Sequence, residues 1–406
     1  MLALRLMKTG AVDWAEPDYE AEAVGLSSDP LFAQQWWHWD VHSPAAWDTS
    51  TGLTNLIVAV CDTGVQAAHP DLAANLVLPG YNTYLNNTYV EDTVGHGTMV
   101  AGIVGAPGDN GLGLAGMAWK IKLLPIRITY ADGVGSAYIS DMAEGLSYAA
   151  DHGAKVINCS FSGYSSSTIE TAAKYARGKG AVVCFAAGNS ALDLSVGYLD
   201  STNIIVVGAT TAADTLATWS NYGLPIDLVA PGENITTTYL GSSYATGSGT
   251  SFASPVVAGL AALIFSVNPG LAPADVERVL KSTTRDLGVA GDDKLYGAGL
   301  VQADAAVLLA GKIVVTPTGL AASAVLKTVT VKWTDRANNE TGYYVERATK
   351  TKTTYGPFTR VATLAANSSS FSQTVASGSY AYRVQAFNST TGVTSDYSAT
   401  ATISVK

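Results

Sequence analysis

Residues 56–61 read Leu-Ile-Val-Ala-Val-Cys and are followed at once by Asp62. Such an unbroken apolar run is typical of a strand that is buried on both faces, as the strands of parallel sheets are. Similar runs follow at residues 121–128, 155–159, 181–186, 204–208 and 226–230. Segments with helical periodicity lie between them, for example at 136–152 and 168–179. This alternation predicts an α/β fold in which a parallel sheet carries helices on both faces.

The composition excludes several other classes of protein. Of 406 residues, 48% are hydrophobic and only 14% are charged, which is too apolar for a disordered chain. The net charge of −10 has the wrong sign for a nucleic-acid-binding protein. The longest apolar stretch, residues 255–267, is too short to cross a bilayer, so we expect no membrane span. Cys61, Cys159 and Cys184 all lie in apolar runs, which favours buried, unpaired cysteines.

The chain changes character near residue 312. Residues 1–311 carry 13 Lys and Arg against 29 Asp and Glu, whereas residues 312–406 carry 10 against 4. Short alternating runs then follow with the spacing of a β-sandwich, at residues 328–333, 343–348, 358–364 and 380–387. The reversal of charge and the new period together predict a domain boundary, with a linker at 312–316 and an all-β domain at 317–406.

Polar residues stand where predicted strands end and predicted helices begin, which is where parallel sheets hold their functional groups. Asp62 ends the first strand, and Asn189 follows another in Ala-Ala-Gly-Asn. His96 lies between two glycines at a helix start, and Ser251 precedes a long apolar helix. Each has an ordinary explanation by itself, because caps, turns and surface residues use the same residue types.

These four residues together, in this order along the chain, are a far more specific signal than any one of them alone. The motifs VAVCDTGV (58–65), GHGTMVAG (95–102), AAGN (186–189) and GTSFASP (249–255) resemble those of the subtilisin-like serine peptidases, and the resemblance spans residues 29–310. The order Asp, His, Ser is the one for which subtilisin is known. The resemblance implies that Ser251 is the nucleophile, His96 its general base and Asp62 the residue that orients the imidazole. It also implies that Asn189 and the Ser251 backbone N–H bind the oxyanion.

The resemblance implies two substrate-binding edges that pair with the peptide backbone and so favour broad specificity. The implied positions are Gly133, Gly135, Ser160, Phe161, Ser162, Gly163, Ala187 and Gly188. Relatives more often have Leu-Gly at the positions of Phe161 and Ser162, which leaves the subsite preferences open. Phe252 stands where many relatives have methionine, so we expect resistance to peroxide.

A structural calcium ion is implied by the same resemblance. Segments 29–32 and 69–72 resemble those that supply carboxylates to the strong calcium site of the family, and loop 107–114 has the length of the loop that wraps the ion. Carried over position by position, the ligands are Asp29, Asp71, Asn110 and the carbonyls of Pro107, Leu112 and Leu114. A capping aspartate and an ordinary glycine turn are the alternative explanation.

The two ends of the sequence carry separate resemblances. Residues 10–19 resemble the last strand of the inhibitory propeptide of the family, so residues 1–22 are interpreted as its remnant and 23–311 as the peptidase domain. The first residues do not resemble a secretion signal, although the family implies an extracellular enzyme. Residues 317–406 resemble a fibronectin type III domain, with Trp333 in its core and Tyr380 at its tyrosine corner.

The sequence therefore predicts a secreted, monomeric serine endopeptidase. Its partners are polypeptide substrates and its own propeptide, with neither nucleic acid nor membrane. Two alternatives stay open, an inactive homologue that binds peptides and a surface- or polymer-binding protein whose C-terminal module sets its role. An esterase of the α/β-hydrolase type is disfavoured, because no Gly-x-Ser-x-Gly motif surrounds Ser251.

Overall fold

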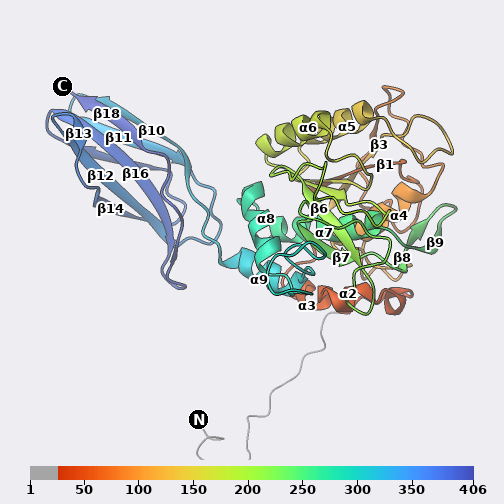
Figure 1. The fold of residues 1–406 in the computed structure, drawn as a ribbon. Helices are drawn as coiled ribbons and strands as arrows, with labels where there is room; N and C mark the ends of the chain where they lie inside the picture. The colour runs from red at the N-terminus through yellow and green to blue at the C-terminus, as the bar shows by residue number, and fades with distance from the viewer. Residues whose placement is uncertain (1–25) are drawn as a thin grey trace, which may run out of the picture.

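The computed structural model describes residues 26–406, which form an α/β part followed by a part made of antiparallel strands (Figure 1). The propeptide interpretation falls on residues 1–22 and lies outside the described residues. The predicted fold class is confirmed, since both the parallel sheet and the all-β C-terminal part are present.

Within residues 26–406, the α/β part is built on a seven-stranded parallel sheet of order β2-β3-β1-β4-β5-β6-β7. The six predicted runs are confirmed as strands, and each is almost wholly buried because helices cover both faces. The bounds are β1 Ile57–Asp62, β2 Tyr81–Asn82, β3 Lys122–Arg127, β4 Val156–Cys159, β5 Val182–Ala186, β6 Ile205–Thr210 and β7 Leu228–Pro231.

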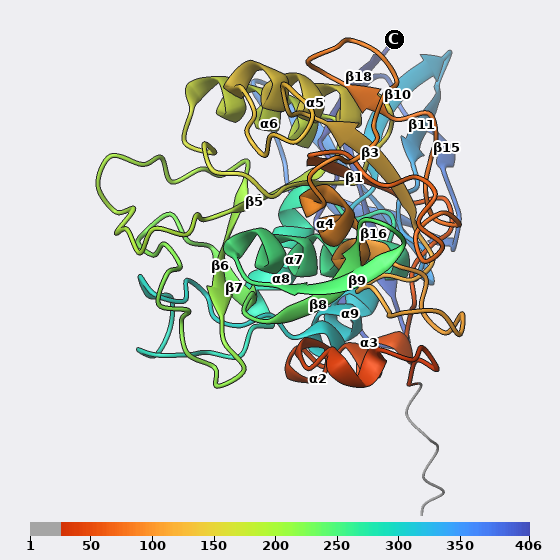
Figure 2. The ribbon, with the colours of Figure 1, turned by 90° about the vertical axis from the view of Figure 1, so that its right-hand side faces the viewer.

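Helices cover the two faces of the sheet (Figures 1 and 2). One face packs against α5 (Ile139–Asp151) and α6 (Ser167–Gly178), whose apolar side chains form one core with alternate residues of the strands. The other face packs against α4 (His96–Gly105) and α7 (Thr250–Val267) in a second core. The smaller elements are η1 Phe32–Gln34, α2 Trp37–Asp40, α3 Ser43–Trp47, α8 Pro273–Ser282, α9 Ala303–Lys312, and the hairpin of β8 Ile235–Tyr239 and β9 Ser243–Gly247.

Helix α7 is the central helix of its core. Among the described residues it is the one helix long and apolar enough to span a membrane, yet 89% of that window is buried inside the protein. It begins five residues before the apolar stretch at 255–267, because Thr250 and Ser251 already belong to its first turn. The three cysteines are buried and unpaired, as the sequence predicts.

The C-terminal part consists of two antiparallel sheets that enclose a third core. Its bounds are β10 Thr318–Val325, β11 Thr328–Thr334, β12 Gly342–Thr351, β13 Thr354–Tyr355, β14 Thr359–Ala365, β15 Ser370–Thr374, β16 Gly378–Asn388, β17 Val393–Thr394 and β18 Ala401–Val405. Trp333 and Tyr380 are buried in this core, and the Tyr380 hydroxyl donates to the carbonyl of Ala376 at 2.9 Å. The four predicted strands are confirmed within β11, β12, β14 and β16.

Candidate active site

Asp62 and His96 are joined where β1 ends and α4 begins. The fully buried Asp62 carboxylate accepts a hydrogen bond from its neighbour's backbone, Thr63 N–H, at 2.8 Å. The same oxygen, Oδ1, lies 2.7 Å from His96 Nδ1. This contact fixes the Nδ1–H tautomer and leaves Nε2 as the basic nitrogen.

Two effects oppose each other at His96. Burial lowers the pKa of the imidazole, whereas the charge and hydrogen bond of Asp62 and the charge of Asp92 raise it. The net result is a pKa above the usual value for histidine. The carboxylate of Asp62 therefore stabilises the imidazolium that forms when Nε2 takes up a proton.

The glycines on both sides of His96 are required by close packing. Gly95 has a φ of +101°, and a Cβ on Gly97 would lie 2.0 Å from the carbonyl oxygen of Gly64. Any larger residue would push the start of α4 away from the end of β1. The glycines thus keep His96 within reach of Asp62.

Asp92 is a positioning residue that the sequence reasoning missed. Its Oδ1 accepts from Thr63 Oγ1 and from the backbone N–H groups of Val94 and Gly95, at 2.8–2.9 Å. Its Oδ2 accepts from the N–H and the hydroxyl of Thr98. These bonds satisfy the donors at the start of α4. An aspartate four residues ahead of His96, just before a predicted helix start, was the signal in the sequence that could have identified it.

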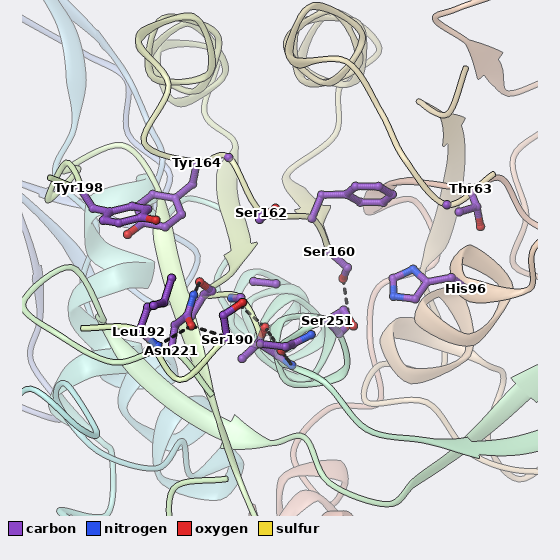
Figure 3. A pocket seen from close by; sticks show the side chains of 18 of the residues that line it. Thr63, His96, Ser160, Ser162, Tyr164, Ser190, Leu192, Tyr198, Asn221 and Ser251 are labelled. Carbon is purple, nitrogen blue, oxygen red and sulfur yellow. Dashed lines mark hydrogen bonds between the residues drawn. The ribbon is translucent and has the colours of Figure 1, made fainter. Parts of the chain in front are cut away.

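Ser251 lies in the first turn of α7 and faces the same pocket as His96 (Figure 3). Within residues 26–406 no hydrogen bond joins its hydroxyl to His96. Such contacts often tighten only when substrate binds. The backbone carbonyl of Ser251 accepts from Ser160 Oγ at 2.9 Å.

A chain of buried hydrogen bonds links the contact between Ser160 and Ser251 to β4, the strand that ends just before Ser160. Asn158 Nδ2 donates to Ser160 Oγ at 2.8 Å, and Asn158 Oδ1 accepts from Ser254 Oγ at 2.7 Å. Asn158 belongs to β4, whereas Ser254 belongs to α7. This chain fixes the register of the helix start against the sheet.

Asn189 is oriented by Thr250. The amide oxygen of Asn189 accepts from both the N–H and the hydroxyl of Thr250 at 2.8 Å. A Cβ on Gly249 would lie 2.8 Å from Ser251 Oγ and 3.3 Å from Asn189 Nδ2. The serine hydroxyl and the amide donor therefore converge on one small space, as a nucleophile and an oxyanion donor must.

The pocket between these groups has a volume of about 510 Å³. Seven of the eight predicted substrate-binding residues line it, namely Gly135, Ser160, Phe161, Ser162, Gly163, Ala187 and Gly188. Gly133 does not line it, and its N–H donates to Thr93 Oγ1 at 2.9 Å. The far end is formed by Tyr164, Leu192, Tyr198 and Asn221, which sequence reasoning missed because they lie in irregular loops (Figure 3).

The segments predicted to hold calcium are brought together. Asp29 and Asp71 are buried, and both contact the loop that contains Asn110. Asp29 Oδ1 accepts from the backbone N–H groups of Asn110 and Gly111, and Asp71 accepts from Asn110 Nδ2 and the N–H of Leu114. Burial raises the pKa of Asp71 to about 6.

The oxygen ligands present here suit calcium, but the carboxylate oxygens of Asp29 and Asp71 accept hydrogen bonds from N–H groups. Among residues 26–406 no group of three or more His, Cys, Asp or Glu side chains is placed to hold a metal ion. Neither Asp29 nor Asp71 forms an ion pair with a lysine or arginine in this stretch of the chain. Two buried carboxylates without a cationic neighbour are what a bound cation would neutralise.

Comparison with known proteins decides the family. Residues 54–299 match the model of the subtilase family, Peptidase_S8. The chain belongs to the subtilase family. As a subtilase it is a serine endopeptidase, which confirms the predicted class of enzyme.

Several subtilases are similar over most of their length. The thermophilic serine proteinase of Bacillus sp. (strain AK1) is 40% identical over 288 residues, covering 70% of this chain and 71% of the relative. Thermitase of Thermoactinomyces vulgaris is 38% identical over 67% of this chain and 93% of its own length. A solved protease from Pseudoalteromonas arctica PAMC 21717 matches with a TM-score of 0.64 and 34% identity, over 70% of this chain and 100% of that one.

Proposed function

We propose that this subtilase hydrolyses peptide bonds through an acyl-enzyme on Ser251, with His96 as general base and Asp62 as the group that orients it. The observation that carries the proposal is the 2.7 Å contact between Asp62 Oδ1 and His96 Nδ1 beside the pocket that Ser251 also lines. An imidazole held in this way presents a basic Nε2 toward the nucleophile.

The steps follow from the chemistry of these groups. Ser251 Oγ attacks the scissile carbonyl carbon while His96 Nε2 takes the hydroxyl proton. The negative charge that forms on the carbonyl oxygen is bound by Asn189 Nδ2 and the Ser251 N–H. His96 then gives its proton to the leaving amine, and the C–N bond breaks. Water repeats the sequence on the ester and frees Ser251.

Substrate binding is proposed to use the two edges of the pocket. Ser160 to Gly163 form one side and Gly135 belongs to the other, so that main-chain pairing accepts many sequences. The ring of Phe161 stands edge-on to His96, with centroids 6.1 Å apart. This bulky side chain narrows the space next to the imidazole, and we expect it to modulate an otherwise broad specificity.

A structural calcium ion is proposed at Asp29, Asp71 and Asn110, with carbonyls of Pro107, Leu112 and Leu114 completing the set. Calcium prefers such oxygen ligands, and its charge would offset the two buried carboxylates. It would act on stability, since these residues lie outside the catalytic pocket.

Extracellular action is proposed from the relatives, one of which is an extracellular protease of Xanthomonas campestris that is 36% identical over 353 residues. We interpret residues 1–22 as a propeptide remnant, 23–311 as the peptidase domain, 312–316 as a linker and 317–406 as a fibronectin type III domain. The buried Trp333 and the bond from Tyr380 to Ala376 support the last assignment.

The test is hydrolysis of a chromogenic peptide by the wild type and by a Ser251→Ala variant of equal thermal midpoint. We expect the variant to lose at least about a thousandfold in kcat. A sulfonyl fluoride should add its mass to Ser251 in the wild type only. A wild type that binds the peptide without cleaving it would establish the inactive homologue instead.

A further inference from the structure

Residues 335–339, in the loop between β11 and β12, contact the peptidase domain, and we name this segment the docking loop. It is anchored in its own domain, because Asp335 accepts a hydrogen bond from the hydroxyl of the buried Tyr343. The side chain of Asn388 in β16 also donates to the carbonyl of Asn339. The docking loop is therefore a fixed feature of the C-terminal core.

Its other contacts reach the C-terminal end of α7. Asn338 Nδ2 donates to the carbonyl of Val267, the last residue of α7, at 3.0 Å, and Arg336 Nη2 donates to the carbonyl of Gly270, in the turn after the helix, at 2.7 Å. The last carbonyls of a helix lack partners within the helix, and a positive charge there is favourable. The docking loop thus helps to cap the helix whose first turn contains Ser251.

The same loop also caps α9. Asn339 Nδ2 donates to the carbonyls of Gly311 and Ile313, at 2.8 and 3.0 Å. From the peptidase side, the fully buried Asn268 donates to Ile313 as well, at 2.9 Å. Two asparagines from distant regions of the chain therefore converge on a single carbonyl at the junction.

Apolar side chains of the two domains also pack against each other beside the docking loop. Ala337 packs against both the α7 core and the C-terminal core, and the adjacent Val314 and Val315 belong to different cores. The backbones approach so closely that a Cβ on Gly270 would lie 1.9 Å from the carbonyl oxygen of Arg336.

A cavity of about 580 Å³ lies between α8, the end of α9 and residues 393–396. Among residues 26–406, the side-chain hydrogen bonds between the two domains come from the docking loop, whose Arg336, Asn338 and Asn339 all donate to carbonyls of the peptidase domain.

We propose that the docking loop couples the peptidase domain and the C-terminal domain into a single cooperative unfolding unit. Domains joined by a short linker ordinarily move and melt separately. Here the C-terminal domain completes the caps of α7 and α9, so that neither domain keeps its full set of hydrogen bonds when the other unfolds. This inference does not depend on the catalytic proposal.

The test is scanning calorimetry of the full chain in a Ser251→Ala background, which prevents self-cleavage. We expect the parent to melt in a single transition. The double variant Arg336→Ala with Asn339→Ala should melt in two, the first at least about 5 °C below the parent. Gly270→Ala should also split the transition, because its Cβ forces the docking loop away while leaving the donors intact.

The matched control removes two positive charges from exposed positions of the same domain, Lys327→Ala with Lys332→Ala. This variant should keep the single transition, within about 2 °C of the parent. Two transitions in the parent would overturn the proposal, and this measurement does not depend on either interface variant folding. A single, unshifted transition in both interface variants would overturn it equally.

Discussion

Replacing Asn158 by alanine should weaken the attachment of β4 to the helix that carries Ser251. Asn158 is fully buried and bonded at both ends of its amide, to Ser160 Oγ at 2.8 Å and from Ser254 Oγ at 2.7 Å. In the alanine variant, the fully buried Ser254 hydroxyl loses its acceptor, and Ser160 loses the donor that orients it. The loss at Ser254 occurs where water has no access, whereas Ser160 lines the substrate pocket.

The magnitude follows from these contacts. Leaving a buried hydroxyl without a partner costs about 1–3 kcal/mol, and the lost packing of the amide adds about 1 kcal/mol. The free energy of unfolding should fall by about 2–4 kcal/mol, which lowers the thermal midpoint by about 4–8 °C in a domain of this size. Because Ser160 also binds the carbonyl of Ser251, we expect kcat/KM to fall about tenfold.

Thr210→Val is the matched control. Within the described residues, Thr210 is fully buried and its hydroxyl has no hydrogen-bond partner, so valine removes a polar atom that makes no bond. Its midpoint should equal or exceed that of the parent. Thermal unfolding is measured in the Ser251→Ala background and kcat/KM in the active enzyme. An Asn158→Ala midpoint within about 2 °C of the parent, or an equal loss in Thr210→Val, would refute the reasoning.

Three further predictions concern the site and its surroundings. Activity should rise with pH as His96 loses its proton, with a midpoint above the usual histidine pKa of about 6.5. Asp62→Asn should lower kcat about 10⁴-fold and shift this rise in activity to lower pH, because burial, which lowers the pKa of His96, is then no longer offset by the charge of Asp62. Phe252→Met should lose activity in dilute peroxide faster than the wild type, whereas equal rates would contradict the role assigned to the missing sulfur. EDTA should lower the thermal midpoint by about 5 °C in the wild type but not in Asp71→Ala, and an unchanged wild-type melt would argue against bound calcium.

The hydrophobic pattern of the sequence was sufficient to predict the strands and helices that have a clear period. Strands such as β1 and β5 are unbroken apolar runs, and a run of that kind has few alternatives to a buried strand. The positions of Asp62 and His96 followed because strand ends and helix starts meet at one edge of a parallel sheet. The structure adds the 2.7 Å contact that joins them.

Irregular segments could not be predicted in the same way. Strand β2 has two residues, too few for any period, and Asn221 reaches the pocket from a loop whose shape depends on distant contacts. Asn221 holds the backbone N–H groups of Ser190 and Leu192, a role that only the folded chain displays. Gly133, for which the resemblance implies a place at a substrate-binding edge, does not line the pocket, and its binding of substrate stays a prediction.

The hydroxyl of Thr250 affects how a displacement of α7 would change the distances between the groups of the site. It ties the amide of Asn189 to the residue directly before Ser251, so one contact positions the proposed oxyanion donor relative to the proposed nucleophile. A small displacement of α7 carries both together and preserves their mutual alignment. We expect such a displacement to change mainly the separation of Ser251 and His96, which belong to different helices and share no hydrogen bond among the described residues. In the proposed mechanism, we therefore expect a shift of α7 to impair proton transfer to His96 before it impairs stabilisation of the oxyanion.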